Sequence, residues 1–122
     1  MASNGIHRLS ARQVQTAADG DYADGGGLLL RIAGGSGSWV FRYTSPAGKR
    51  REMGLGKLVR NDLAAAGKSL TGARDAADDA RRLIRDGKDP IDVRNAERER
   101  ARQALEIKVE ASRKAKATLA RV

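Results

Sequence analysis

The sequence predicts an α+β fold, in which a small three- to four-stranded antiparallel sheet packs against helices and a long C-terminal helix follows. Two observations carry this prediction. Between residues 28 and 55, three runs of alternating apolar and polar residues are separated by stretches rich in Gly, Ser and Pro, and a period of two is typical of half-buried strands. After residue 69, apolar residues recur at the intervals of an amphipathic helix instead.

The sheet region is predicted to be a meander. Its main strands fall within 28–32, 38–44 and 49–55, and Tyr22-Ala23 is expected as a short edge strand before three consecutive glycines. Because successive side chains of a strand point to opposite faces, the alternation separates a core set from an outward set. The core set is Leu28, Leu30, Ile32, Trp39, Phe41, Tyr43, Met53 and Leu55, and the outward set is Arg31, Val40, Arg42, Thr44, Arg50 and Glu52.

Two helices are predicted to support this sheet. A short one lies within 9–18, with Ser10 as its N-cap. A longer amphipathic helix begins at Ser69 and stops at Gly87, and its mostly alanine stripe is expected to pack on the core face of the sheet. The segment between the sheet and Ser69 is expected to be a connection, with a helical turn or an insertion at 63–66.

A third helix is predicted from Pro90, as its first residue, through Ile91 to Val122. Its apolar residues keep no clean heptad, so an exposed helical connector is favoured over a self-sufficient coiled coil. The sequence therefore predicts a sheet-plus-helix domain over 1–90 and a helical connector over 91–122.

The basic charge of the chain is concentrated on the predicted sheet. The formal net charge is +9 over 122 residues, and between residues 31 and 60 seven Lys or Arg residues accompany a single Glu. A purely solubilising surface would intersperse both signs. A concentrated basic face instead favours binding to a polyanion, most commonly a nucleic acid.

Several other functions are disfavoured by composition and spacing. The chain has no Cys and a single His, so neither a disulfide nor a zinc site is expected. The stretch 66–69, Ala-Gly-Lys-Ser, lacks the first glycine of a phosphate-binding loop. The acidic residues of the longer helix are interleaved with arginines, which is typical of surface ion pairs. We expect no enzyme activity, cofactor, metal or membrane segment, and a soluble cytoplasmic protein.

The outward face is the predicted binding site for double-stranded DNA. A strand pair fits the major groove, where Arg pairs with guanine and Thr meets the thymine methyl group. Binding to single-stranded nucleic acid is less favoured, because it needs exposed aromatic side chains and those of the strands are predicted to point to the core. The residues expected nearest the base edges are Arg31, Arg42, Thr44 and Arg50, and those expected at phosphates are Lys49, Arg51, Lys57 and Arg60.

The order of these motifs resembles a known family, the N-terminal arm-type DNA-binding domain of phage and genomic-island integrases of the tyrosine recombinase class. The resemblance covers roughly residues 9–95 and rests on several short motifs in sequence. They are Leu-Ser-Ala-Arg-Gln-Val at 9–14, Asp-Gly-Gly-Gly-Leu-Leu-Leu-Arg-Ile at 24–32, Trp-Val-Phe-Arg-Tyr at 39–43, Gly-Lys-Arg-Arg at 48–51, Gly-Leu-Gly at 54–56, Ser-Leu at 69–70, Ala-Arg at 73–74 and Gly-Lys-Asp-Pro at 87–90.

The resemblance implies a domain that grips arm-type sites in the integration or excision of a mobile genetic element, beside recombinase domains or other integrase subunits as partners. The catalytic domain of that family is not expected within these residues. The chain departs from the family in a longer 57–68 segment and in Gly72, where a Glu would complete a capping box with Ser69 at a gain of ~1 kcal/mol.

Two alternatives to sequence-preferring DNA binding stay open. The C-terminal helix could make the chain a protein-interaction or oligomerisation module of a recombination complex. The basic face could also bind nucleic acid without sequence preference, which predicts a steep salt dependence but no preferred site.

Overall fold

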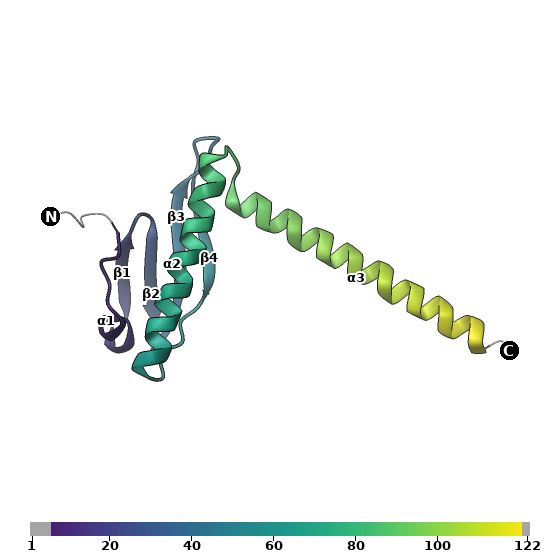
Figure 1. Ribbon diagram of the computed structural model, residues 1–122, viewed down its shortest axis with the longest axis horizontal. Helices are drawn as coiled ribbons and strands as arrows, with labels where there is room; N and C mark the ends of the chain where they lie inside the picture. The colour runs from purple at the N-terminus through teal and green to yellow at the C-terminus, as the bar shows by residue number, and fades with distance from the viewer. Residues whose placement is uncertain (1–5, 121–122) are drawn as a thin grey trace. The chain divides into compact units, whose positions relative to one another are not determined.

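The computed structural model describes residues 6–120 and shows the predicted α+β fold (Figure 1). It contains a four-stranded antiparallel sheet and three helices, of which the last is long. The chain divides into two compact units, 1–89 and 90–122, and each unit is described by itself.

The sheet of the first unit is a meander with strand order β1-β2-β3-β4. The strands are β1 (Gly20–Gly25), β2 (Leu28–Ala33), β3 (Ser36–Thr44) and β4 (Arg50–Lys57). The predicted edge strand at Tyr22-Ala23 is thus the middle of a full strand. A β-bulge shifts the β3–β4 register, because Trp39 pairs with Gly56 while Val40 pairs with Gly54.

The core face of the sheet carries the residues that period-two alternation predicts. Six of the eight predicted core residues, on β2 and β3, are at most 5% exposed, whereas the two on β4 are only half-buried. The edge position of β4 accounts for this difference. The six are Leu28, Leu30, Ile32, Trp39, Phe41 and Tyr43. Val40, which was predicted to point outward, is on the outward face but is buried opposite the buried Leu29, so this apolar pair contributes little to the surface.

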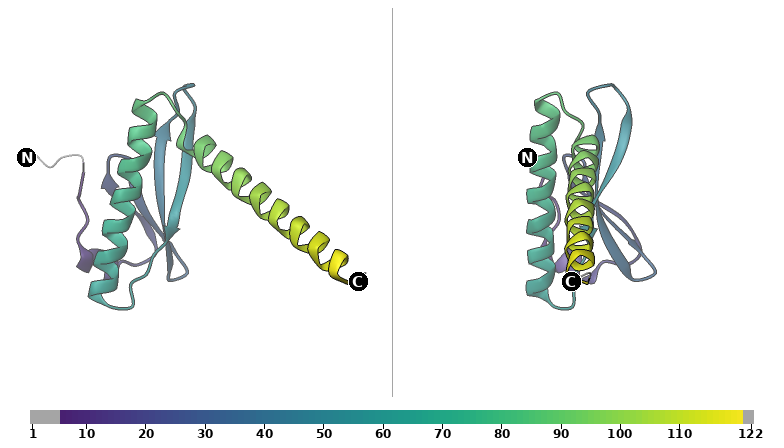
Figure 2. Two further views of the ribbon diagram at one scale, coloured as in Figure 1. Left: turned by 45° about the vertical axis from the view of Figure 1, so that its right-hand side comes forward. Right: turned by 90° about the vertical axis from the view of Figure 1, so that its right-hand side faces the viewer.

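Helix α2 (Leu63–Arg85) runs along the core face of the sheet (Figure 2). It begins at Leu63 and not at the predicted Ser69, because the carboxylate of Asp62 accepts a hydrogen bond from the backbone N–H of Ala65 at 2.7 Å and caps the helix there. The stretch 63–66 is therefore the first part of α2. Gly72 lies inside α2, so the prediction that it weakens an N-terminal capping box is wrong.

The N-cap of the first helix and the end of α2 lie where the sequence predicts them. Helix α1 (Ala11–Thr16) has the predicted N-cap, and Ser10 forms a reciprocal capping box with Gln13. After α2, Gly87 adopts a φ of +79°, the left-handed conformation of a helix-terminating glycine. Helix α1 packs closely on α2, since a Cβ added to Gly67 would lie 3.4 Å from the Cβ of Ala11.

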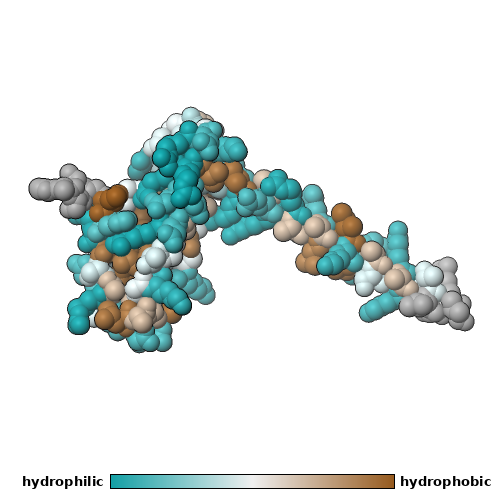
Figure 3. Space-filling model, in the orientation of Figure 1, coloured by the Kyte–Doolittle hydropathy of each residue, from teal (hydrophilic) through white to brown (hydrophobic). Residues whose placement is uncertain are grey.

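The second unit is helix α3 (Pro90–Ala120), which begins at the predicted proline. The predicted last residue of this helix, Val122, lies outside the described residues. The exposed apolar side chains of α3 lie among hydrophilic ones (Figure 3), and Arg102 forms ion pairs with Glu99 and Glu106 on the same helix. None of the helices in the described part of the chain has the length and apolar character needed to cross a membrane.

Candidate nucleic-acid interface

The outward face of the sheet brings the four residues predicted nearest the base edges onto one surface. In the strand register, Asp21 lies opposite Arg31, Arg42 lies opposite Glu52, and Thr44 lies opposite Arg50. We use the term outward face for these six residues together with Ala23, Leu29, Ser38, Val40, Gly54 and Lys57, which share their side of the sheet.

Arg31 of the outward face binds two carboxylates, one on β1 and one on β4. Its guanidinium donates to Asp21 at 3.2 and 3.3 Å and to Glu52 at 3.2 Å. The Arg31 side chain is 37% exposed, so it still reaches solvent. The hydrogen bonds that Arg31 donates to Asp21, and then the one it donates to Glu52, raise the pKa of Arg31 above its already high usual value.

Glu52 also holds Arg42, and this second contact is the shorter one. The Nε of Arg42 donates to a Glu52 carboxylate oxygen at 2.7 Å, and the Arg42 side chain is 45% exposed. The hydrogen bonds from Arg42 and Arg31 outweigh desolvation and hold the pKa of Glu52 below its usual range. One carboxylate of β4 therefore links two arginines of the outward face, one on β2 and one on β3.

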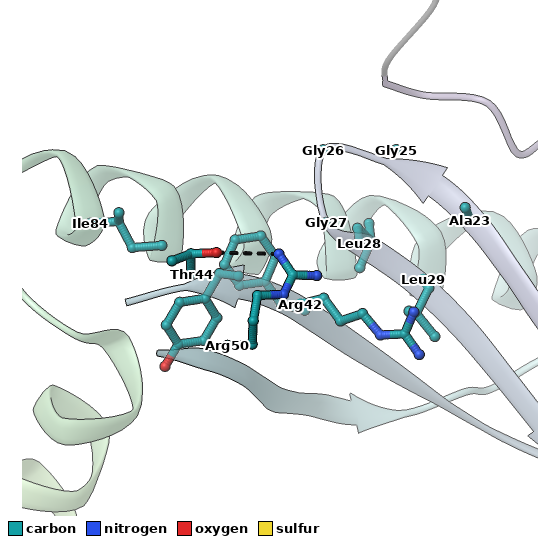
Figure 4. Close-up of a pocket in the computed structure, with 12 residues that line it drawn as sticks. Ala23, Gly25, Gly26, Gly27, Leu28, Leu29, Arg42, Thr44, Arg50 and Ile84 are labelled. Carbon is teal, nitrogen blue, oxygen red and sulfur yellow. Dashed lines mark hydrogen bonds between the residues drawn. The ribbon is translucent and has the colours of Figure 1, made fainter. Parts of the chain in front are cut away.

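Thr44 and Arg50 lie together at the end of the sheet where β3 and β4 extend beyond β2. The Arg50 guanidinium donates to the Thr44 hydroxyl at 3.2 Å, and these two residues and Arg42 line a hollow of about 520 Å³ beside the β1–β2 turn (Figure 4). The rest of its lining includes Leu28, Leu29 and Phe41, so the hollow combines apolar side chains with two arginines.

The four residues predicted at phosphates do not share one environment. Lys49 and Lys57 are exposed, at the turn before β4 and at its last residue. Arg51 is half-buried and forms an ion pair with Asp89 at 2.8 Å. Arg60 donates to the backbone carbonyl oxygens of Val14, Ala17 and Gly35 at 3.3, 2.6 and 3.1 Å. Arg51 and Arg60 thus tie segments of the first unit together.

A buried ion pair that the sequence did not reveal anchors the first strand. Asp24, 1% exposed, accepts hydrogen bonds from Arg74 of α2 and from the backbone N–H of Leu9. Burial raises the pKa of Asp24, but the hydrogen bonds from Arg74 and Leu9 outweigh it and bring the pKa below its ordinary value. Asp24 and Arg74 both belong to motifs on which the family resemblance rests, but a single sequence does not show that they are in contact.

The β1–β2 turn is fixed against the outward face at its glycines. The carbonyl oxygen of Gly27, at a φ of +94°, accepts a hydrogen bond from the backbone N–H of Arg42 at 2.7 Å. Arg81 of α2 donates to the Gly26 carbonyl oxygen at 3.0 Å and lies over the Phe41 ring, 5.5 Å from its centroid. Gly27 thus binds the backbone of Arg42, and Arg81 contacts the neighbouring Phe41.

The opposite end of the sheet is held by a second carboxylate. Asp19 accepts hydrogen bonds from the backbone N–H groups of Gly34 and Gly35 at 2.9 and 3.1 Å, and these bonds, that from Gly35 first, lower the pKa of Asp19. Among the described residues, no cluster of three or more His, Cys, Asp or Glu side chains is arranged to hold a metal ion.

Comparison with known proteins gives one match. No curated protein and no solved structure matches the chain significantly. Residues 9–97, which are well over half of the chain, match the family described as the arm DNA-binding domain. The matched range includes the whole sheet, both supporting helices and every residue of the outward face. The chain therefore belongs to the arm-type DNA-binding domains of phage integrases.

Proposed function

We propose that the outward face binds the major groove of double-stranded arm-type sites during site-specific integration or excision by a phage-type integrase of the tyrosine recombinase class. The observation that carries this proposal is the gathering of Arg31, Arg42, Thr44 and Arg50 on one exposed sheet surface. This chain would bind DNA without cutting it, in the bacterial cytoplasm, and helix α3 would connect it to recombinase domains or to other integrase subunits.

The dimensions of the sheet suit the groove. Neighbouring strands lie about 4.8 Å apart, and the major groove of B-form DNA is about 12 Å wide. The β3–β4 pair, which carries Arg42, Thr44 and Arg50, therefore fits with its side chains toward the base edges. The terminal N–H groups of Arg42 suit the O6 and N7 acceptors of guanine.

Lys49 and Lys57 are the proposed phosphate contacts. They are exposed at the two ends of β4, so a duplex lying across the outward face would bring a phosphate strand near each end. Phosphate contacts fix register without reading sequence. We assign Arg51 and Arg60 a supporting role, because Arg51 pairs with Asp89 and Arg60 donates to backbone carbonyl oxygens.

The proposal is tested by sequencing the duplexes that the 122-residue protein enriches from a random DNA pool at near-physiological salt. A short enriched motif is expected. Substituting Arg42→Ala or Arg50→Ala should then weaken binding to the enriched duplex by about 5- to 150-fold. Arg85→Ala, which removes an exposed arginine of α2, is the matched control and should leave sequence preference unchanged. Absence of a motif, or unchanged affinity in both outward-face variants, would overturn the proposal.

A second candidate function is protein interaction through α3. Leu105 and Val109, 61% and 41% exposed, lie one helical turn apart and line a shallow hollow of about 310 Å³. Light scattering tests this function: a stable dimer that dissociates in Leu105→Lys would favour it, and a monomer at all concentrations would exclude self-association.

A further inference from the structure

We propose that Glu52 is a specificity-determining residue of the outward face, which positions Arg42 for guanine and suppresses binding to other DNA. This inference rests on the proposed function and deepens it. Glu52 is the single acidic residue among seven Lys or Arg residues between positions 31 and 60. Glu52 accepts hydrogen bonds from both Arg31 and Arg42.

Glu52 binds the Nε of Arg42 at 2.7 Å, through one oxygen of its carboxylate, whereas the other oxygen accepts from Arg31 at 3.2 Å. Gripping the guanidinium at Nε fixes the plane of the group and leaves the N–H groups at its Nη atoms outside this ion pair. Those are the groups that form a bidentate pair with guanine O6 and N7.

An arginine side chain loses considerable rotamer freedom when it binds, and that loss weakens the complex. Arg42 is held before DNA arrives, at its backbone by Gly27 and at its guanidinium by Glu52. Less freedom is therefore lost when the correct base pair is met.

Asp21 and Glu52 carry two negative charges that match the two positive charges of Arg31 and Arg42. These four residues together carry no net charge, whereas Lys49, Lys57 and Arg50 have no carboxylate partner among the described contacts. Sequence-independent attraction to phosphates grows with the number of available cations. The pairing with Glu52 withholds two of them from that attraction.

The experiment compares three variants that each remove one negative charge. Glu52→Gln keeps the size of the side chain but loses the charge that holds both arginines. Asp21→Asn affects only Arg31, the one arginine to which Asp21 is paired. Asp75→Asn removes an exposed carboxylate from α2, on the other side of the sheet. The measured quantity is the ratio of affinities for the enriched duplex and for a scrambled duplex of equal length.

Glu52→Gln should lower this ratio by about tenfold or more, with tighter binding to the scrambled duplex and a steeper dependence of that binding on salt concentration. Asp21→Asn should lower it less, and Asp75→Asn should leave it unchanged. In motifs enriched by each variant, Glu52→Gln should lose preference at the same base pair as Arg42→Ala. At that base pair, the double variant Glu52→Gln with Arg42→Ala should lose no more preference than Arg42→Ala alone. Circular dichroism of each variant confirms that the fold persists.

The inference is overturned if Glu52→Gln keeps the base preference that Arg42→Ala loses, or if Asp75→Asn lowers the ratio equally. Either result would leave the proposed function in place. Failure of the proposed function has a different signature, because the wild-type protein itself would then enrich no motif or would be indifferent to Arg42→Ala.

Discussion

Asp24 and Arg74 are 50 residues apart in the chain and are joined by two side-chain hydrogen bonds of 2.9 Å. The Arg74 guanidinium also donates to the backbone carbonyl oxygen of Leu9 at 2.8 Å. Strand β1, helix α2 and the segment before α1 therefore meet at one buried carboxylate. This junction holds the hairpin that carries Arg31.

Substituting Arg74→Ala is expected to destabilise the protein by about 3 kcal/mol, because removing one partner of a buried ion pair leaves the other charge uncompensated. Urea unfolding followed by circular dichroism measures the change. Arg82→Ala, which removes an exposed pair with Asp79, should cost less than about 1 kcal/mol. Equal effects of the two substitutions would contradict the role given to Asp24.

The same carboxylate predicts a pH dependence. The pKa of Asp24 is lower in the folded protein than the ordinary value of 3.8, so the unfolded chain binds its proton first as the solution is acidified. Its contribution to stability is fully present above pH 3.8 and is lost as the pH falls through the folded pKa. The stability difference between the wild type and Asp24→Asn should therefore shrink below that pH, in unfolding curves measured at a series of pH values. A constant difference would show that Asp24 keeps its ordinary pKa.

Gly27→Ala is expected to destabilise the β1–β2 turn by about 3 kcal/mol or more. An added Cβ would lie 2.3 Å from the Arg42 carbonyl oxygen and 2.9 Å from the Phe41 ring, at a φ of +94°. Gly34 also has a positive φ but has open space around it, so Gly34→Ala should cost only about 1 kcal/mol. Thermal unfolding of the two variants separates the steric clash from the backbone effect that they share.

Ser69→Ala should destabilise the contact between sheet and helix by about 1–3 kcal/mol, because the buried indole of Trp39 donates to the Ser69 hydroxyl at 2.9 Å and would lose its acceptor. Trp39 is the single tryptophan, so its fluorescence reports the site directly. The exposed Thr71 provides a control on the same helix, and Thr71→Ala should change stability by less than about 0.5 kcal/mol. An unshifted emission spectrum in Ser69→Ala would argue against the hydrogen bond.

Lys49→Ala and Lys57→Ala should each weaken binding to the enriched and scrambled duplexes by a similar factor. If each lysine contacts one phosphate, the slope of log affinity against log salt should become shallower by about one. Affinities measured at several salt concentrations give this slope. A loss confined to the enriched duplex would instead assign the lysine to base recognition.

The sequence predicted the sheet well because alternation within a strand is a local signal. Alternation predicted that Arg31, Arg42 and Glu52 point to the same face of the sheet. It did not predict the ion pairs between them. Those depend on the strand register, which the β-bulge near Leu55 shifts. The four residues were therefore placed correctly on one face of the sheet, while the ion pairs of Arg31 and Arg42 were not predicted.

The start of α2 was predicted too late for a physical reason. Gly67 and Gly72 lower the intrinsic helix propensity of its first half. Ser69 is also a residue type favoured at the N-cap of a helix. In the structure, Gly67 allows the close approach of Ala11, and the Ser69 hydroxyl accepts a hydrogen bond from the Trp39 indole. Both are tertiary contacts, which a single sequence does not display.

The hydrogen bond between Arg42 and Gly27 bears on any attempt to alter which DNA the protein recognises. A hairpin made of β3 and β4, transplanted alone into a relative, would arrive without the turn that holds Arg42 at its backbone. The smallest exchangeable piece is therefore the continuous stretch from Gly25 to Lys57, in which the turn and the arginine travel together.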